Sequence, residues 1–235
     1  MKKKIFVYVG SNYPESTELK YIKELLKIVE SKLDVEYDIV TPRNSNIKYC
    51  LGCANCFSNG FCPLDKQDDA QDIKNKILNA DFIVFSSPVY MHNVSGNFKN
   101  FIDRTCYWCH LFKLLGKPSM SIVSTYTNGA EKVIDILKQY MDSLGLICVG
   151  NIVLNLLNNH FDDSIDKYAN DIVKALNKEI KLETTQKMEA LYTVEKMMFK
   201  SYPKDHAEYI YWNDNGLFEY TSLQDIIEKE KKVLI

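Results

Sequence analysis

The strongest constraint on the fold is an alternation of short apolar runs with longer segments of helical period. Five runs have the length and composition of strands: residues 4–9, 35–40, 81–87, 119–125 and 146–153. Three of these runs are almost continuously apolar, as expected of strands that are covered on both faces. Helical spacing of apolar residues marks three further segments: residues 19–33, 133–144 and 165–180. The alternation predicts one doubly wound α/β domain over residues 1–181, with a parallel sheet between two layers of helices.

Residues 182–235, which we call the C-terminal appendage, do not continue this alternation. Apolar residues at helical spacing between 188 and 199 predict a helix that ends before Tyr202-Pro203. The segment AEYIYWNDNGLFEYTS predicts a β-hairpin, because aromatic runs flank Asp214-Asn215-Gly216, a typical turn sequence. The remaining residues to 235 predict a short amphipathic helix. We expect the appendage to pack on the body of the domain or on a partner subunit.

The composition is that of a soluble globular protein. Of 235 residues, 46% are apolar and 26% are charged, and the net charge of −2 gives no indication of a nucleic-acid partner. No apolar run reaches the roughly 18 residues of a membrane span, and the run before Gly10 is too short for a signal peptide. We therefore expect a cytoplasmic protein that binds neither nucleic acid nor membrane. In that reducing compartment, clustered cysteines indicate a metal site or catalysis rather than disulfides.

The stretch CLGCANCFSNGFC places four cysteines in the pattern C-x2-C-x2-C-x5-C: Cys50, Cys53, Cys56 and Cys62. Four thiolates in so short a segment are the ligand set of a [4Fe–4S] cluster, and the repeated two-residue steps and the Cys-Pro ending are similar to a ferredoxin run. A zinc site with four thiolate ligands is the main alternative. A third interpretation is a set of reduced thiols that holds no metal.

Ligands of an open parallel sheet bind beyond the carboxyl ends of its strands, so the loops after strands one, three and four are the places to search. The first of these loops contains no GxGxxG pattern, which argues against a dinucleotide site. Its hydroxyl and amide side chains gather instead at a helix N-terminus: Ser11, Asn12, Ser16 and Thr17. That arrangement favours a phosphate, although Ser16 or Thr17 also has the position of a helix cap.

The loops after strands three and four predict a site for a planar ring. Pro88 ends strand three, Tyr90 and Met91 offer flat or soft apolar surface, and His92 and Asn93 supply hydrogen-bonding groups. A heteroaromatic ring requires this mixture of apolar walls and polar edges. The loop STYTNGAEK after strand four is again small and polar.

The segment SSPVYMHNVSGNFKNFIDR resembles the corresponding segment of the flavodoxin-like NAD(P)H-dependent FMN reductases. Within that family, CLGCANCFSNGFC resembles the compact cysteine motif of the iron–sulfur flavoproteins. The resemblance covers about residues 3–160. It implies a sheet of order 2-1-3-4-5, bound FMN, and a dimer whose subunits complete each other's flavin site.

The resemblance also implies roles for individual residues. Ser11, Ser16 and Thr17 would hold the FMN phosphate, next to Asn12. The isoalloxazine ring would be framed by residues of the loops after strands three and four: Pro88, Val89, Tyr90, Met91, Asn93, Thr125, Tyr126, Asn128 and Gly129. Cys50, Cys53, Cys56 and Cys62 would bind the [4Fe–4S] cluster.

We therefore expect an FMN-dependent oxidoreductase that takes electrons from NAD(P)H or a ferredoxin-like donor and passes them through the cluster to an acceptor that the sequence does not identify. This chemistry requires no catalytic side chain. The alternatives are an FMN-only quinone or nitro reductase and a non-catalytic redox carrier or sensor. We expect a homodimer or a tetramer.

The other cysteines predict packing rather than chemistry. Cys106 and Cys109 flank Trp108 in a hydrophobic stretch, and Cys148 lies in a predicted strand. For Asp103 and Arg104 we expect a structural ion pair with a neighbouring helix rather than a catalytic role.

Overall fold

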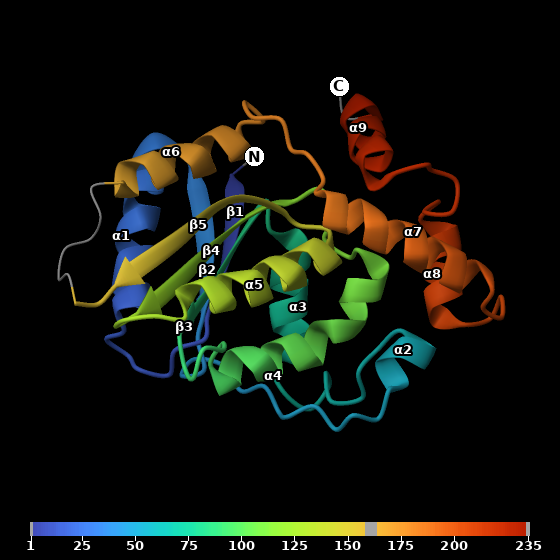
Figure 1. Ribbon diagram of the computed structural model, residues 1–235, viewed down its shortest axis with the longest axis horizontal. Helices are drawn as coiled ribbons and strands as arrows, with labels where there is room; N and C mark the ends of the chain where they lie inside the picture. Colours follow the sequence, from blue (N-terminus) through green and yellow to red (C-terminus); the bar gives the residue numbers. More distant parts are fainter. Residues whose placement is uncertain (1, 158–163, 234–235) are drawn as a thin grey trace.

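In the computed structural model, which describes residues 2–157 and 164–233, five parallel strands form one sheet (Figure 1). They are β1 (Lys3–Val9), β2 (Val35–Val40), β3 (Phe82–Pro88), β4 (Pro118–Thr125) and β5 (Ile147–Asn155). Their order is β2-β1-β3-β4-β5, so the order reverses between β1 and β3. The predicted strands and the flavodoxin-like order are confirmed.

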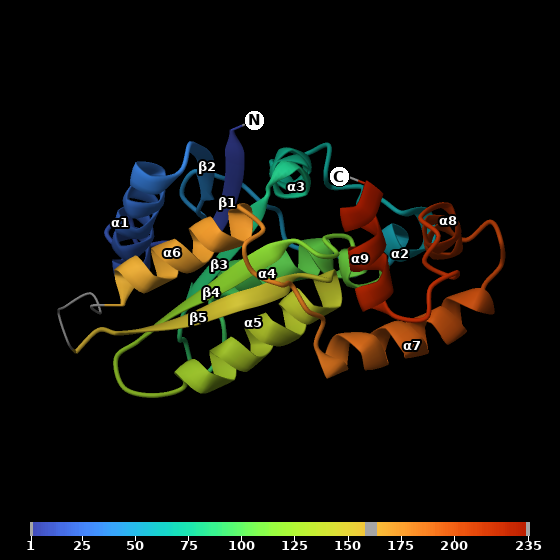
Figure 2. The same ribbon diagram turned by 90° about the horizontal axis from the view of Figure 1, so that it is seen from above.

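Helices cover both faces of the sheet (Figure 2). One face carries α1 (Thr17–Lys32) and α6 (Ile165–Leu176), and the other carries α3 (Ala70–Asn79), α4 (Gly96–Thr105) and α5 (Ala130–Leu144). Within β1, Val7 belongs to the first of these cores and Tyr8 to the second, because successive strand residues point to opposite faces. In the part of the chain that the structure describes, no helix is both long and apolar enough to cross a membrane.

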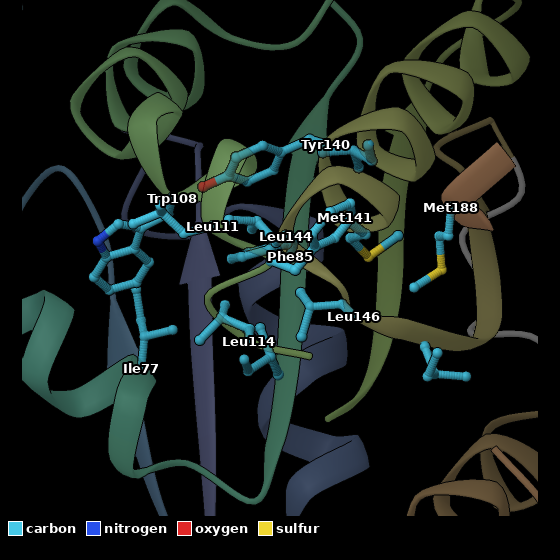
Figure 3. Close-up of a cluster of buried hydrophobic side chains, with 14 of the residues drawn as sticks. Ile77, Phe85, Trp108, Leu111, Leu114, Tyr140, Met141, Leu144, Leu146 and Met188 are labelled. Carbon is cyan, nitrogen blue, oxygen red and sulfur yellow. The ribbon is translucent and has the colours of Figure 1, made fainter. Parts of the chain in front are cut away.

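The core on the α5 face extends beyond the sheet. Figure 3 shows Phe85 of β3 beside Tyr140 and Met141 of α5. The same core includes Trp108 of the 3-10 helix η1 (Cys106–Leu111), which follows α4 directly, and Met188 of the C-terminal appendage. The appendage and the sheet therefore share one hydrophobic core.

The appendage consists of α7 (Gln186–Lys200), α8 (Ala207–Asp214) and α9 (Leu223–Val233), which lie at one end of the molecule in Figure 1. Trp212 of α8 is fully buried and stacks on Tyr192 of α7, with 5.5 Å between the ring centroids. Its indole Nε1 donates a hydrogen bond to the carbonyl oxygen of His110 in η1, at 2.8 Å. This side chain thus joins α7 and α8 to the body.

The predicted hairpin is wrong, because its first half is the helix α8. The turn signal has a different role: Gly216 adopts a φ of +65° just beyond the helix end. There the amide of Gly216 donates to the carbonyl of Asn213, and the amide of Leu217 donates to that of Trp212, which is typical of a glycine-terminated helix. A glycine of positive φ serves a helix end and a tight hairpin equally well, so the sequence signal did not discriminate between them.

A buried polar cluster lies where α7, α8 and η1 meet. His110 Nδ1 and Glu208 Oε1 are 2.6 Å apart, and the buried Oε2 of Glu195 has no hydrogen-bond partner among the described residues. Burial raises the pKa of Glu195 to about 8; His110 opposes this shift and Glu208 adds to it. Burial lowers the pKa of His110, but the hydrogen bond to Glu208 and the negative charges of Glu208 and Glu195 together outweigh it, and the pKa is raised.

We expect Glu195→Gln to remove a pH-dependent part of the stability. The pKa of Glu195 is raised from 4.5 to about 8, so its contribution is fully present below 4.5 and is lost as the pH rises to about 8. Relative to the variant, the parent should lose about 1–4 kcal/mol of unfolding free energy over that window. Urea unfolding of both proteins at acidic, neutral and alkaline pH measures the difference. A difference that does not change with pH contradicts this assignment.

We expect Trp212→Ala to lower the free energy of unfolding by about 3–5 kcal/mol, because it removes a large buried ring and leaves the His110 carbonyl unpaired. Ile210→Ala, on the same helix at a side chain that is 42% exposed, is the matched control and should change stability by less than about 1 kcal/mol. Denaturant unfolding followed by circular dichroism compares the two. Equal effects would show that the appendage does not depend on this contact.

Candidate functional site

The loops after β1, β3 and β4 leave the same edge of the sheet, at the carboxyl ends of the strands. Ser95, the N-cap of α4, joins the first two of them. Its Oγ donates to the carbonyl oxygen of Gly10 at 2.7 Å, and its amide donates to Ser87 Oγ at 2.9 Å. A Cβ on Gly10 would lie 2.7 Å from Ser95 Oγ, so only glycine allows this approach. The sequence analysis did not place Ser95 among the flavin residues, although a serine directly before a helix is a typical N-cap.

The loops after β3 and β4 are also connected. His92 Nε2 and Asn128 Oδ1 are hydrogen-bonded at 3.0 Å, and Thr125 Oγ1 donates to the carbonyl oxygen of Asn128 at 2.7 Å. Gly129 has a φ of +84°, and a Cβ there would lie 2.6 Å from His92 Cδ2. The two loops predicted to frame a ring are therefore held against each other by specific contacts.

The first loop holds its hydroxyl groups in local hydrogen bonds. Ser16 Oγ accepts from the amide of Leu19 and caps α1, as one of the two sequence interpretations requires, and Ser11 Oγ accepts from the amide of Tyr13. The buried Glu18 in the first turn of α1 accepts a 2.6 Å hydrogen bond from Ser124 Oγ at the end of β4. Sequence reasoning missed this contact, because an acidic residue in a first helical turn is ordinary. A phosphate bound here would share the helix end with this carboxylate.

Large apolar side chains of these loops are exposed at the sheet edge. Met91 is 95% exposed, and Tyr13, Tyr90 and Tyr126 each have more than half of their surface accessible. Met91 also has a positive φ of 50°, which bulky residues rarely adopt. A strained and exposed apolar residue beside polar loop groups is typical of a surface that a ligand or a partner covers.

The structure thus brings the predicted flavin residues to one edge from three loops. Those of the first loop are Ser11, Asn12, Ser16 and Thr17; those of the other two are Pro88, Val89, Tyr90, Met91, Asn93, Thr125, Tyr126, Asn128 and Gly129. Contact with a cofactor stays a prediction for each of them.

The four cysteines of the motif line a second site, a cavity of about 360 Å³ that we call the cysteine cavity. Cys50 and Cys53 are exposed, whereas Cys56, in the short helix α2 (Asn55–Asn59), and Cys62 are half-buried. Gly52 and Ala54, on either side of Cys53, have positive φ values of 64° and 56° and turn the chain around the cavity. The glycine is required by conformation rather than by space, since a Cβ at Gly52 would meet nothing within 4 Å.

Arg104 holds both ends of the cysteine segment. Its guanidinium is buried; Nη1 donates to the carbonyl oxygen of Lys48 at 2.8 Å and to Asp68, and Nη2 donates to Asp65 Oδ1 at 2.9 Å. Burial lowers the pKa of Arg104, but the hydrogen bonds to Asp68 and Asp65 outweigh it and the pKa is raised. Lys74 adds a second cation to Asp65, at 2.6 Å. The ion pairs of Arg104 are therefore made with Asp65 and Asp68 in the segment before α3, rather than with a neighbouring helix, and the adjacent Asp103 pairs with Lys99 of its own helix.

The cysteine cavity has the donor groups that an iron–sulfur cluster requires. In the described residues, no three histidine, cysteine or acidic side chains are arranged to hold one metal ion. A [4Fe–4S] cluster instead needs four thiolates around a space, because each thiolate binds a different iron. Arg104 also lines the cavity, and its buried Nε has no hydrogen-bond partner in the described part of the chain. Cluster sulfurs accept such N–H groups, so the residues present fit the cluster.

Cys106 lines the same cavity, which the packing interpretation did not anticipate. An interaction between the thiols of Cys56 and Cys106 lowers the pKa of Cys56 to about 7 and raises that of Cys106. Cys109 packs against the hydrophobic core, as predicted. Because Cys106 lies more than forty residues after Cys62, motif spacing could not associate it with the other four.

We expect Arg104→Gln to lower the unfolding free energy by about 3–5 kcal/mol, because it leaves Asp68 buried without its cation. Lys99→Gln is the matched control on the same helix; its exposed pair with Asp103 should contribute less than about 1 kcal/mol. Urea unfolding of the metal-free proteins compares them. If the two variants are equally stable, Arg104 does not hold the cysteine segment.

Comparison with known proteins agrees with this geometry. An iron–sulfur flavoprotein of Archaeoglobus fulgidus is 27% identical over 215 residues, which cover 88% of this chain and 96% of the relative. One from Clostridioides difficile is 32% identical over 147 residues, covering 61% of this chain and 64% of the relative, and one from Methanosarcina thermophila is 31% identical over 144 residues, covering 57% and 71%.

Among solved structures, an NADH:FMN oxidoreductase has a TM-score of 0.55 at 17% identity, covering 77% of this chain and 92% of that chain. A flavone reductase has a TM-score of 0.59 at 16% identity, covering 77% and 66%. These two likenesses concern the fold.

The model of the NADPH-dependent FMN reductase family matches residues 3–160, which is more than half of the chain. The chain therefore belongs to the NADPH-dependent FMN reductase family of flavin oxidoreductases, in its iron–sulfur flavoprotein branch.

Proposed function

We propose that the chain is an electron-transfer flavoprotein with FMN at the carboxyl edge of the sheet and a [4Fe–4S] cluster in the cysteine cavity. NAD(P)H or a ferredoxin-like donor supplies the electrons. The observation that supports the proposal is that one domain has both three connected loops at the sheet edge and four motif cysteines around one cavity of about 360 Å³.

The loop residues would bind and orient the flavin. Thr17 and the amides at the start of α1 would hold the phosphate, since a helix N-terminus attracts an anion. Tyr90, Met91 and Tyr126 are exposed beside this helix end and would cover the ring, while Asn93 and Asn128 supply polar groups at its edge. FMN, when bound, supplies the conversion of two-electron into one-electron transfer. The exposed apolar side chains also support a homodimer, because a second subunit would cover what the ring leaves exposed.

The cysteine cavity would hold the one-electron centre. Cys50, Cys53, Cys56 and Cys62 would each bind one iron, and Arg104 would direct its Nε–H to a sulfur. The buried cation also compensates part of the negative charge that four thiolates bring to the cavity. The cluster, when bound, supplies single-electron transfer to the acceptor.

Flavin affinity tests the first site. Tyr90→Ala and Asn93→Ala should weaken FMN and riboflavin alike, by about tenfold, because they act on the ring. Thr17→Ala should weaken FMN and leave riboflavin unchanged, since only FMN carries the phosphate. Fluorescence titration gives the dissociation constants, with Tyr37→Ala on β2 as the control. Variants that all bind both flavins as the parent does would place the flavin elsewhere.

Metal analysis tests the second site. After anaerobic reconstitution, the parent should contain about four irons per chain with the visible spectrum of a cluster. Cys53→Ala should lose the iron and keep FMN, whereas Cys148→Ala, outside the cysteine cavity, should keep both. Stoichiometric zinc, or a parent that takes up no metal, contradicts the proposed cluster.

A further inference from the structure

The cysteine cavity holds one thiol more than a four-iron cluster requires. Cys106 lines it together with Cys50, Cys53, Cys56 and Cys62. The four motif cysteines come from a single surface loop, whereas Cys106 is the C-cap of α4 and the first residue of η1, and thus belongs to the body of the domain. The cavity therefore contains one thiol that the proposed cluster would not use as a ligand.

The fifth thiol contacts one motif cysteine. Cys56 and Cys106 both line the cavity, and their thiols interact with each other. A rotation about χ1 moves a cysteine sulfur between staggered positions without moving the backbone. An iron bound to one of these sulfurs is therefore within reach of the other.

The spacing of the two thiols is held by buried contacts. Arg104, two residues before Cys106, binds the Lys48 carbonyl on one side of the cysteine loop and Asp65 and Asp68 on the other. In α2, the ring of Phe57, the residue after Cys56, packs on the ring of His110 in η1, with 4.9 Å between the ring centroids. The loop that carries Cys56 is thus fastened to the helix end that carries Cys106.

We propose that Cys106 is an alternative ligand for the iron that Cys56 binds, so that the cavity offers two ligand sets that differ in one cysteine. The inference rests on the proposed cluster. In the exchange, the bond between iron and the Cys56 sulfur breaks and a bond to the Cys106 sulfur forms. The proton of the Cys106 thiol goes to the released Cys56 sulfur, and no electron is transferred. The cluster would then be attached to the body of the domain as well as to the loop.

Iron content of alanine variants tests the exchange. Cys56→Ala should retain most of the parent's iron, because Cys106 replaces the missing ligand, whereas Cys53→Ala should bind iron at least about tenfold more weakly. Cys106→Ala alone should keep its iron through Cys56. The double variant Cys56→Ala/Cys106→Ala should fall to the level of Cys53→Ala. Cys109→Ala, three residues further along and outside the cavity, is the matched control and should not change the result in either background.

A spectroscopic measurement makes the test independent of how much cluster each variant holds. In the Cys56→Ala background, Cys106→Ser puts an oxygen in the place of a sulfur ligand and should shift the electron paramagnetic resonance spectrum of the reduced cluster. In the parent background, the same substitution should leave the spectrum unchanged. FMN content and the urea unfolding midpoint identify a variant that has failed to fold.

The outcomes separate this inference from the proposed function. A parent that binds no iron overturns both. A parent that binds iron while Cys56→Ala loses it to the extent of Cys53→Ala overturns the exchange alone. The exchange is also overturned if Cys106→Ser leaves the spectrum of Cys56→Ala unchanged.

Discussion

The buried guanidinium of Arg104 is the interaction on which the cysteine cavity depends. It comes from the last turn of α4 and binds the chain before and after the cysteine motif, through the Lys48 carbonyl, Asp65 and Asp68. Removing this cation would leave the buried Asp68 carboxylate unpaired and would release one of the two cations on Asp65. None of the four motif cysteines is fully buried, so the position of their loop depends on such contacts at its two ends.

The same helix connects this cavity with the flavin edge. At the N-terminus of α4, Ser95 binds Gly10 and Ser87 and so joins the loops that follow β1 and β3. At the C-terminal end lie Arg104 and Cys106. A ten-residue helix rises on the order of 15 Å, so α4 sets the separation of the two sites within one chain. The C-terminal appendage packs against the cysteine segment: α8 lies against α2 (Figure 1), and Trp212 of α8 is hydrogen-bonded to His110 near the end of η1.

Much of this arrangement could be predicted from the sequence, because periodicity reports local structure directly. The strands were recognisable from their apolar runs, and the parallel alternation then fixed which loops share an edge. The cysteine motif was recognisable because its ligands are adjacent in the chain. What the sequence could not provide were contacts between distant segments: Glu18 with Ser124, Arg104 with Asp65 and Asp68, and Cys106 with Cys56. Gly216 shows a different limit, since its positive φ suits a helix end as well as a hairpin.

The central claim is that one domain carries a flavin and a separate one-electron centre. An anaerobic reductive titration of the reconstituted protein, followed by visible absorbance, counts the electrons that each chain accepts. The account predicts about three, two for FMN and one for the cluster, with the flavin and cluster bands bleaching at different stages. A protein that accepts only the two electrons of its flavin, with no further bleaching, would contradict it.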